Sequence, residues 1–235
     1  MSRVILALAI AVAIAPPALA REELSSDLTI FYRTDGDNDH CTGRVDASYH
    51  AVNNPVNCAF ASIQKVVDAA SKIDNMGFTI RAQHGTESGQ KVFTENVIIK
   101  RLTGDFNILG NGNNTIIYSA GGATLELHDV FASVGVGAIA IKSGPSAIGI
   151  MSSYNSRFRC MNGLNFISDG GAIGSGTATN ADVFVHDNQA QATLLSCSYT
   201  RTGVSNYHLW ANASGHIFNE NSSITFVNAA VWAFA

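Results

Sequence analysis

The feature that most constrains this chain is a long succession of short β-type segments that starts after Gly77 and continues to the C-terminus. Runs of β-branched and aromatic residues alternate with Gly, Asn, Ser and Asp, which favour turns. No helical pattern separates these runs, as it would in a doubly wound α/β sheet. We therefore expect an all-β fold.

Two all-β architectures are open at this point: an antiparallel sandwich or jelly roll, and a solenoid that winds in coils of short parallel strands. Strands of about three to five residues, tight Asn and Gly corners, and small residues such as Ala138, Ala140 and Gly149 suit stacked coils. Loose repeats of roughly 25 to 30 residues favour the solenoid. They begin near Asn107, Ala132, Ser156, Asn188 and Ile217.

One amphipathic helix is expected ahead of these strands. Asn57 is its expected N-cap, Lys72 lies in its last turn, and Gly77 offers a left-handed stop just beyond it. Its apolar residues recur at the spacing of one helical face. They are Phe60, Ile63, Val66, Val67, Ala70 and Ile73.

Two stretches near this helix resemble the N-terminal part of pectin-lyase-like proteins. They read FYRTDGDND at 31–39 and AFASIQKVVDAA at 59–70. In that family an extended Tyr-containing strand, a Gly/Asp/Asn loop and a Phe-x-Thr/Ser-Ile-Gln helix lead into the first coil. The resemblance implies a right-handed parallel β-helix solenoid with one N-terminal capping α-helix, the cap covering 28–76. His40 departs from the family, where a Gly often closes the acidic loop.

The first twenty residues have the pattern of a cleavable secretory signal. Arg3 precedes an uncharged apolar run, and the small residues at 18–20 form a cleavage site. Cleavage before Arg21 would leave a linker at 21–27 and one β-helix domain at 28–235. No later segment is apolar enough to span a membrane. We expect a protein that is secreted, to the periplasm or the cell exterior.

The charge pattern argues against nucleic-acid binding. The formal net charge is −4, and the basic residues are scattered, with Lys100 and Arg101 as the closest pair. Nucleic-acid-binding proteins gather Lys and Arg on one face. The expected partner is instead a polysaccharide or a cell-surface glycan.

Four cysteines in an exported chain favour disulfides over free thiols. Three pairings are open, and we prefer Cys41 with Cys58 and Cys160 with Cys197, because these close the shorter loops.

An acidic loop places oxygen ligands where a calcium loop needs them. Asp35, Asp37, Asp39 and Asp46 fall at positions 1, 3, 5 and 12 of such a loop, but His40 replaces the Gly of position 6. A calcium site and an ordinary solvated turn, in which Asp side chains cap their own backbone, are both consistent with this pattern.

Candidate catalytic residues fall on neighbouring coils. Arg157 and Arg159 share one face of a strand, and Asp182, His186 and Asp187 follow about one coil later. A second row of polar residues lies on an earlier coil and consists of Glu126, His128 and Asp129. These groups could supply acid, base and substrate contacts, or they could be polar only because they face water.

Aromatic residues become frequent in the C-terminal half of the chain. Exposed aromatic faces are common platforms for sugar rings. We expect Tyr199 and Tyr207 to stack on a ligand, because they lie among polar loop residues. The apolar last residues, 231–235, suggest either a plug over the final coil or a contact with another subunit. The second option predicts a homotrimer, which sedimentation would test.

Two classes of function follow. The preferred one is a secreted β-helix module that binds carbohydrate or another surface ligand without strong catalysis. The alternative is a polysaccharide lyase or glycoside hydrolase that acts in a cleft along the solenoid, with calcium as its expected cofactor if it has one. A phage-like spike or fibre component is a third option, which fits poorly with a secretory signal. The fold alone does not distinguish them.

Overall fold

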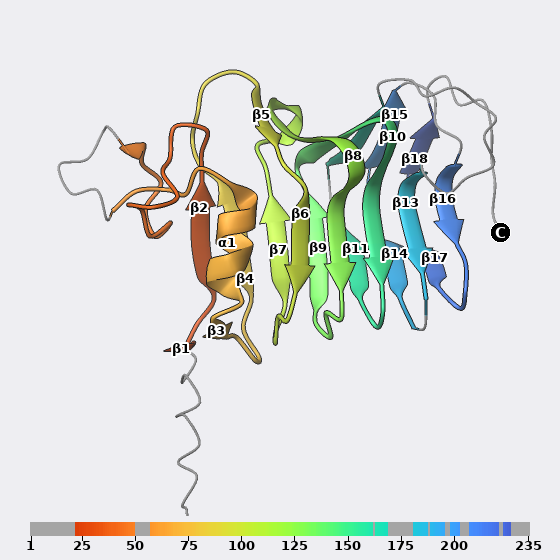
Figure 1. Cartoon of the computed structure of the whole chain (residues 1–235), viewed down its shortest axis with the longest axis horizontal. Coiled ribbons are helices and arrows are strands. Elements are labelled where there is room, and N and C mark those ends of the chain that lie inside the picture. The colour runs from red at the N-terminus through yellow and green to blue at the C-terminus, as the bar shows by residue number, and fades with distance from the viewer. Residues whose placement is uncertain are drawn as a thin grey trace, which may run out of the picture.

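The chain forms a parallel β-solenoid, as the sequence predicts. The computed structural model describes residues 22–49, 57–161, 163–168, 181–187, 189–195, 198–202, 207–220 and 223–226. Its coils succeed one another along the long axis of the molecule, from β2 to the strands β16 to β18 (Figure 1). All strand pairs among the described residues are parallel, which excludes the antiparallel sandwich and jelly roll.

Two large sheets form the walls of the solenoid. The seven-stranded sheet consists, in spatial order, of β17 (His216–Glu220), β14 (Gln191–Leu195), β11 (Arg157–Cys160), β9 (Ser133–Gly137), β7 (Phe106–Leu109), β4 (Ile80–His84) and β2 (Leu28–Tyr32). The nine-stranded sheet contains β5 (Lys91–Thr94), β6 (Val97–Lys100), β8 (Thr115–His128), β10 (Ile139–Ser153), β12 (Leu164–Ser168), β13 (Ala181–His186), β15 (Ser198–Thr202), β16 (Tyr207–Ala211) and β18 (Ser223–Phe226). Each coil passes from one sheet to the other and back.

The predicted repeat starts lie close to the strands of the seven-stranded sheet. Its strands β7, β9, β11, β14 and β17 begin at Phe106, Ser133, Arg157, Gln191 and His216. Two strands are much longer than the three to five residues expected, since β8 has 14 residues and β10 has 15. The register between β8 and β10 shifts between Ser143 and Ser146. Such an irregularity bends a strand while its ladder continues.

The core consists of in-register stacks of apolar side chains. Ile80, Phe106, Val134, Phe158 and Ala192 occupy one position in successive strands, and each is at most 1 % exposed. Burial of one such large side chain stabilises the fold by about 1.5–3 kcal/mol. The same inward position therefore recurs once per coil.

The predicted helix is present but shorter than expected. Helix α1 covers Ile63–Ala70, and Ser62 is its N-cap, with its hydroxyl accepting from the Lys65 amide at 3.2 Å. The prediction of Asn57 as N-cap is wrong. Phe60 lies before the helix, in a bridge with Tyr32, and the Ile73–Asp74 segment forms β3, which pairs with β1 (Glu22–Glu23).

Helix α1 packs against the edge of β6. The Gln64 side chain accepts a hydrogen bond from the Ile98 amide at 2.7 Å and donates one to the Ile98 carbonyl at 3.2 Å. Glu95 accepts from the Ile63 and Gln64 amides, at 2.9 and 3.0 Å, at the helix N-terminus. A side-chain amide thus replaces the neighbouring strand that β6 lacks at this position.

Several predictions fall on parts of the chain that the structure does not describe. The signal at 1–20 and the C-terminal segment 231–235 lie outside the described residues, so cleavage and the trimer stay predictions. Among the described residues, no helix has the length and apolar character needed to span a membrane.

Candidate functional site

One corner of the solenoid collects residues with left-handed backbone conformation. Here the chain leaves β8, β10, β13 and β16 and enters β9, β11, β14 and β17, and we call this stack of four turns the corner. Positive φ angles of 44° to 71° occur in every turn. The residues are Asp129, Tyr154, Asn155, Asp187, Gln189, Ala213 and Ser214. The tight turn between two sheets imposes this conformation, although it costs a non-glycine residue about 1 kcal/mol or more.

A row of aromatic rings runs along the corner over four coils. We call His128, Tyr154, His186, Phe184 and Trp210 the aromatic row. The ring centres lie 6.1 Å apart for His128 and Tyr154 and 6.3 Å apart for Tyr154 and His186. Phe184 stacks on His186 at 5.3 Å and contacts Trp210 at 4.8 Å. In Figure 1, the parent strands β8, β10, β13 and β16 lie side by side.

The outer faces of this row are open to a ligand. Tyr154 is 50 % exposed. The imidazole side chains of His128 and His186 are 31 % and 35 % exposed, and Trp210 is partly exposed. Phe184 is only 6 % exposed and contacts both His186 and Trp210. The row therefore presents partly exposed aromatic side chains that an extended ligand could contact.

His128 is held between a hydroxyl and a carboxylate. Its Nε2 contacts Glu126, and its Nδ1 lies 2.7 Å from Ser153 Oγ. The Ser153 hydroxyl also lies 3.1 Å from the Leu127 carbonyl, so its single proton can be donated to that carbonyl or to His128 Nδ1. The order Ser, His, Glu is also that of a hydrolytic triad. Ser153 is only 1 % exposed, however, so this serine orients the imidazole and does not attack a substrate.

His186 and Asp187 form a second imidazole and carboxylate pair. His186 Nε2 lies 2.8 Å from Asp187 Oδ2, but the angle does not make this approach a hydrogen bond. The His186 ring is parallel to Phe184 within 5°. His186 Nδ1 is buried and has no hydrogen-bond partner among the described residues. Unsatisfied buried polar atoms are rare and often mark functional positions.

A polar groove lies directly beside the row. Its volume is about 490 Å³, and we call it the corner groove. Its lining consists of amide, hydroxyl and imidazole side chains, which are Asn155, Gln189, Gln191, Ser214 and His216. Amides and hydroxyls both donate and accept hydrogen bonds, as sugar hydroxyls do.

The structure brings together some of the predicted catalytic residues. His186 and Asp187 lie at the corner, and Arg157 is in register with Gln191 of the groove. Arg159 instead reaches toward Asn107, at 3.4 Å. Asp182 is 2 % exposed and lies near the opposite end of β13, so it does not join the corner. Glu126 and His128, which belong to the second set of polar residues predicted from the sequence, lie on the same face of the sheet as His186.

The acidic residues predicted to bind calcium are held in separate contacts within the protein. Asp35 and Asp46 bind Arg33, at 2.7 and 2.9 Å. The hydrogen bond from Arg33 lowers the pKa of Asp35. Asp37 accepts from the amides of Asp39 and His40 in its own turn. No group of three acidic, His or Cys side chains suited to a metal occurs in the described part of the chain, and calcium stays a prediction.

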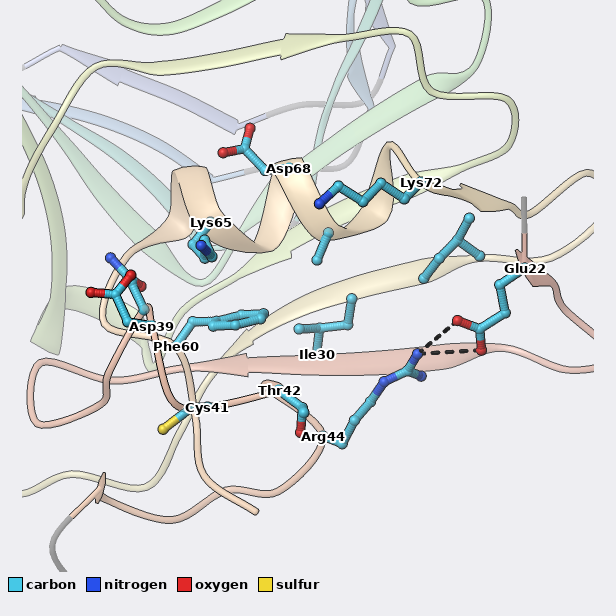
Figure 2. A pocket seen from close by; sticks show the side chains of 13 residues that line it. Glu22, Ile30, Asp39, Cys41, Thr42, Arg44, Phe60, Lys65, Asp68 and Lys72 are labelled. Carbon is cyan, nitrogen blue, oxygen red and sulfur yellow. Dashed lines mark hydrogen bonds and ion pairs between the residues drawn. The ribbon is translucent and has the colours of Figure 1, made fainter. Parts of the chain in front are cut away.

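A hollow of about 520 Å³ lies between α1 and the loop after β2 (Figure 2). Ile30 and Phe60 lie at its floor, and Arg44 pairs with Glu22 at 3.4 Å on the other side. Lys65 extends from the helix, whereas Lys72, predicted in the last helical turn, follows the helix end at Ala70. Asp39 and Asp68 also line the hollow, so that its acidic and basic side chains are equal in number. This mixture of charges selects no single class of ligand.

One of the two preferred disulfides is confirmed. Cys41 and Cys58 form a disulfide with a Cα distance of 4.9 Å. Cys197 lies outside the described residues, so its pairing with Cys160 stays a prediction. Tyr199 and Tyr207 lie in β15 and β16, and their stacking on a ligand also stays a prediction.

The sequence pattern missed the groove and the central role of Tyr154. Asn155, Gln189 and Gln191 belong to no motif; the first two lie in the turns after β10 and β13, and Gln191 is the first residue of β14. Aligning the repeats at the ends of β10 and β13 would have placed Tyr154 beside Asp187.

Comparison with known proteins adds no assignment, because no family model, curated protein or solved structure matches this chain. The resemblance to pectin-lyase-like proteins is therefore supported at the level of the parallel β-solenoid.

Proposed function

We propose that this protein, exported and cleaved before Arg21, binds carbohydrate at the corner of the solenoid. The observation that carries the proposal is the aromatic row beside a groove of uncharged hydrogen-bonding side chains. Sugars have apolar ring faces and polar edges, so a binding site for them combines aromatic platforms with amides and hydroxyls. The corner offers both on adjacent surfaces.

The experiment is a binding screen with neutral and acidic polysaccharides, using the wild type, Tyr154→Ala and Tyr118→Ala. Tyr154 supplies the most exposed ring of the row. Tyr118 is a partly exposed tyrosine on the other half of β8, where it lies under Lys142. We expect Tyr154→Ala to weaken binding at least tenfold, a loss of about 1.4 kcal/mol, and Tyr118→Ala to bind as the wild type does. Absence of binding to every polysaccharide would contradict the proposal.

Glycoside hydrolysis is the second candidate, and the two imidazole and carboxylate pairs favour it. Glu126 belongs to β8 and Asp187 follows β13, so the two carboxylates lie on either side of β10, the strand that leads into Tyr154. Glycosidases use a pair of carboxyl groups that flank the scissile bond. If the protein cleaves a bound glycan, Glu126→Gln and Asp187→Asn should each abolish release of reducing ends while leaving binding intact.

A further inference from the structure

We infer that the ligand of the corner is a linear, uncharged polysaccharide that lies along the solenoid axis with one sugar ring over each coil. This inference rests on the proposed function and specifies its substrate class. It follows from the spacing of the rings, from the chemistry of the groove and from the charges along the row.

The spacing of the aromatic row matches an extended sugar chain. Successive coils are separated by about 4.8 Å, the distance between neighbouring strands. The ring centres from His128 through Tyr154 to His186 are 6.1 and 6.3 Å apart, and Trp210 on the next coil joins the row through Phe184, with which it is in register. One pyranose unit of an extended, equatorially linked chain has a similar length. A chain parallel to the axis can therefore repeat one contact per coil.

The residues that line the groove also favour a sugar chain that runs along the solenoid axis. Asn155, Gln189 and Ser214 follow β10, β13 and β16, so the lining residues also repeat along the axis. Gln191 and His216 are in register on β14 and β17 and extend this series. A sugar chain over the aromatic row would direct the hydroxyls on one edge into the groove, where each amide can donate and accept.

The charges along the row favour an uncharged ligand. The carboxylates of Glu126, Asp129 and Asp187 belong to the turns and strand ends that carry the row. A uronic acid bound over Tyr154 would place its own carboxylate between those of Glu126 and Asp187, and like charges held close together repel. Arg157 of β11 is in register with Gln191 and is therefore the cation next to the groove lining. Among the described residues, the groove lining contains no Asp, Glu, Lys or Arg.

The test is a calorimetric titration with oligosaccharides of two to six units from a β-1,4-linked neutral glycan, and with oligogalacturonates of equal lengths. We expect affinity to rise with each unit up to about four, the number of coils that carry the row, and then to level off. Oligogalacturonates should bind at least tenfold more weakly.

Two variants test which rings contact ligands of each length. Trp210→Ala should weaken four-unit ligands about tenfold and leave two-unit ligands unchanged, while Tyr154→Ala should weaken all lengths. Trp210→Phe, which keeps a ring, should restore binding, and circular dichroism checks that each variant is folded.

The outcomes separate the inference from the proposed function. Affinity that does not grow beyond two units, or tighter binding of oligogalacturonates, would overturn the inference while carbohydrate binding stands. If no oligosaccharide or parent polysaccharide binds, both fail.

Discussion

Glu87 carries a buried carboxylate whose charge is stabilised by hydrogen bonds. Its side chain is only 2 % exposed, and it accepts hydrogen bonds from the Thr34 amide and hydroxyl, at 2.9 and 2.6 Å, and from His84 at 2.7 Å. Lys91 lies 3.6 Å away. Burial acts to raise the pKa of Glu87, but the hydrogen bonds from Thr34 and His84 outweigh it and lower the pKa. The folded state therefore favours the carboxylate.

Replacing this carboxylate should destabilise the protein. Glu87→Gln replaces one carboxylate oxygen, which accepts from Thr34 or from the buried His84, by an amide group that donates. A buried donor left without an acceptor costs about 1–3 kcal/mol in the free energy of unfolding. Urea denaturation at pH 7 measures this loss. The control is Glu22→Gln, which breaks an ion pair with Arg44 at the surface and should change stability by less than about 0.5 kcal/mol.

The cost of Glu87→Gln should also depend on pH. Because folding lowers the pKa of Glu87, the unfolded chain takes up the proton first as the pH falls. The stabilisation is complete above the ordinary value of 4.5 and is lost as the pH falls through the lower, folded-state pKa. The difference between wild type and Glu87→Gln should therefore shrink below pH 4.5, and a constant difference would contradict this assignment.

Ala213 tests the strain at the corner. It is exposed and has a φ of 45°, a conformation that glycine adopts without penalty. Ala213→Gly should leave stability unchanged or raise it by up to about 1 kcal/mol, because relief of strain offsets the added freedom of the unfolded chain. Ala120→Gly, at an exposed position with ordinary φ, should cost roughly 0.5–1 kcal/mol. Thermal denaturation would compare the two variants, and equal losses would argue against strain.

Among the elements, α1 and β6 depend on each other. Gln64 binds both backbone groups of Ile98, and Glu95, just before β6, binds the first amides of the helix. Helix and strand edge thus satisfy each other's unpaired groups. The apolar spacing predicted which helix residues are buried, namely Ile63, Val66, Val67 and Ala70. It missed the helix ends, because Phe60 and Ile73 continue the spacing but bind strands.

Gln64→Ala should loosen this junction. Loss of the two bonds to Ile98 and the bond to Asp68 should lower stability by about 1–2 kcal/mol. Hydrogen exchange of the Ile98 amide should become faster relative to amides in β11. Lys65→Ala is the matched control on the same helix, and it should leave both quantities nearly unchanged. Unchanged exchange at Ile98 in Gln64→Ala would show that the edge is protected by other means.

At the scale of the whole molecule, close stacking of coils holds the solenoid together. Gly149 of β10 lies opposite Asp182 of β13, and a Cβ atom at this glycine would lie 2.5 Å from the Asp182 carbonyl oxygen. The contact is with backbone, so rotation of a side chain cannot relieve it. Adjacent coils can approach to their normal distance here only because residue 149 has no side chain.

Gly149→Ala should therefore destabilise the whole fold. We expect a loss of about 1–3 kcal/mol, the usual cost of overpacking, and a lower thermal midpoint. Gly121→Ala is the control, because a Cβ atom at Gly121 would meet no atom within 4 Å. That variant should be neutral or slightly stabilising. Equal effects of the two substitutions would show that coil spacing does not limit this position.

The sequence by itself determined the local and periodic features of this protein. Strand-forming runs between turn residues indicated the all-β class, and the repeat starts near Asn107, Ala132 and Ser156 fell within two residues of β7, β9 and β11. The first disulfide, Cys41 with Cys58, followed from proximity along the chain. These features depend on neighbours in the sequence, so a local pattern is sufficient to predict them.

Only the tertiary structure decided which residues meet at the corner. Neighbouring groups of the row come from different coils, and the length of a coil varies, since β9 and β11 begin 24 residues apart (133 to 157) and β11 and β14 begin 34 apart (157 to 191). A shift of one residue turns a strand side chain to the opposite face. Asp182 and His186 lie on the same face of β13, but only His186 is at the strand end that meets Tyr154, and this meeting depends on stacking between coils.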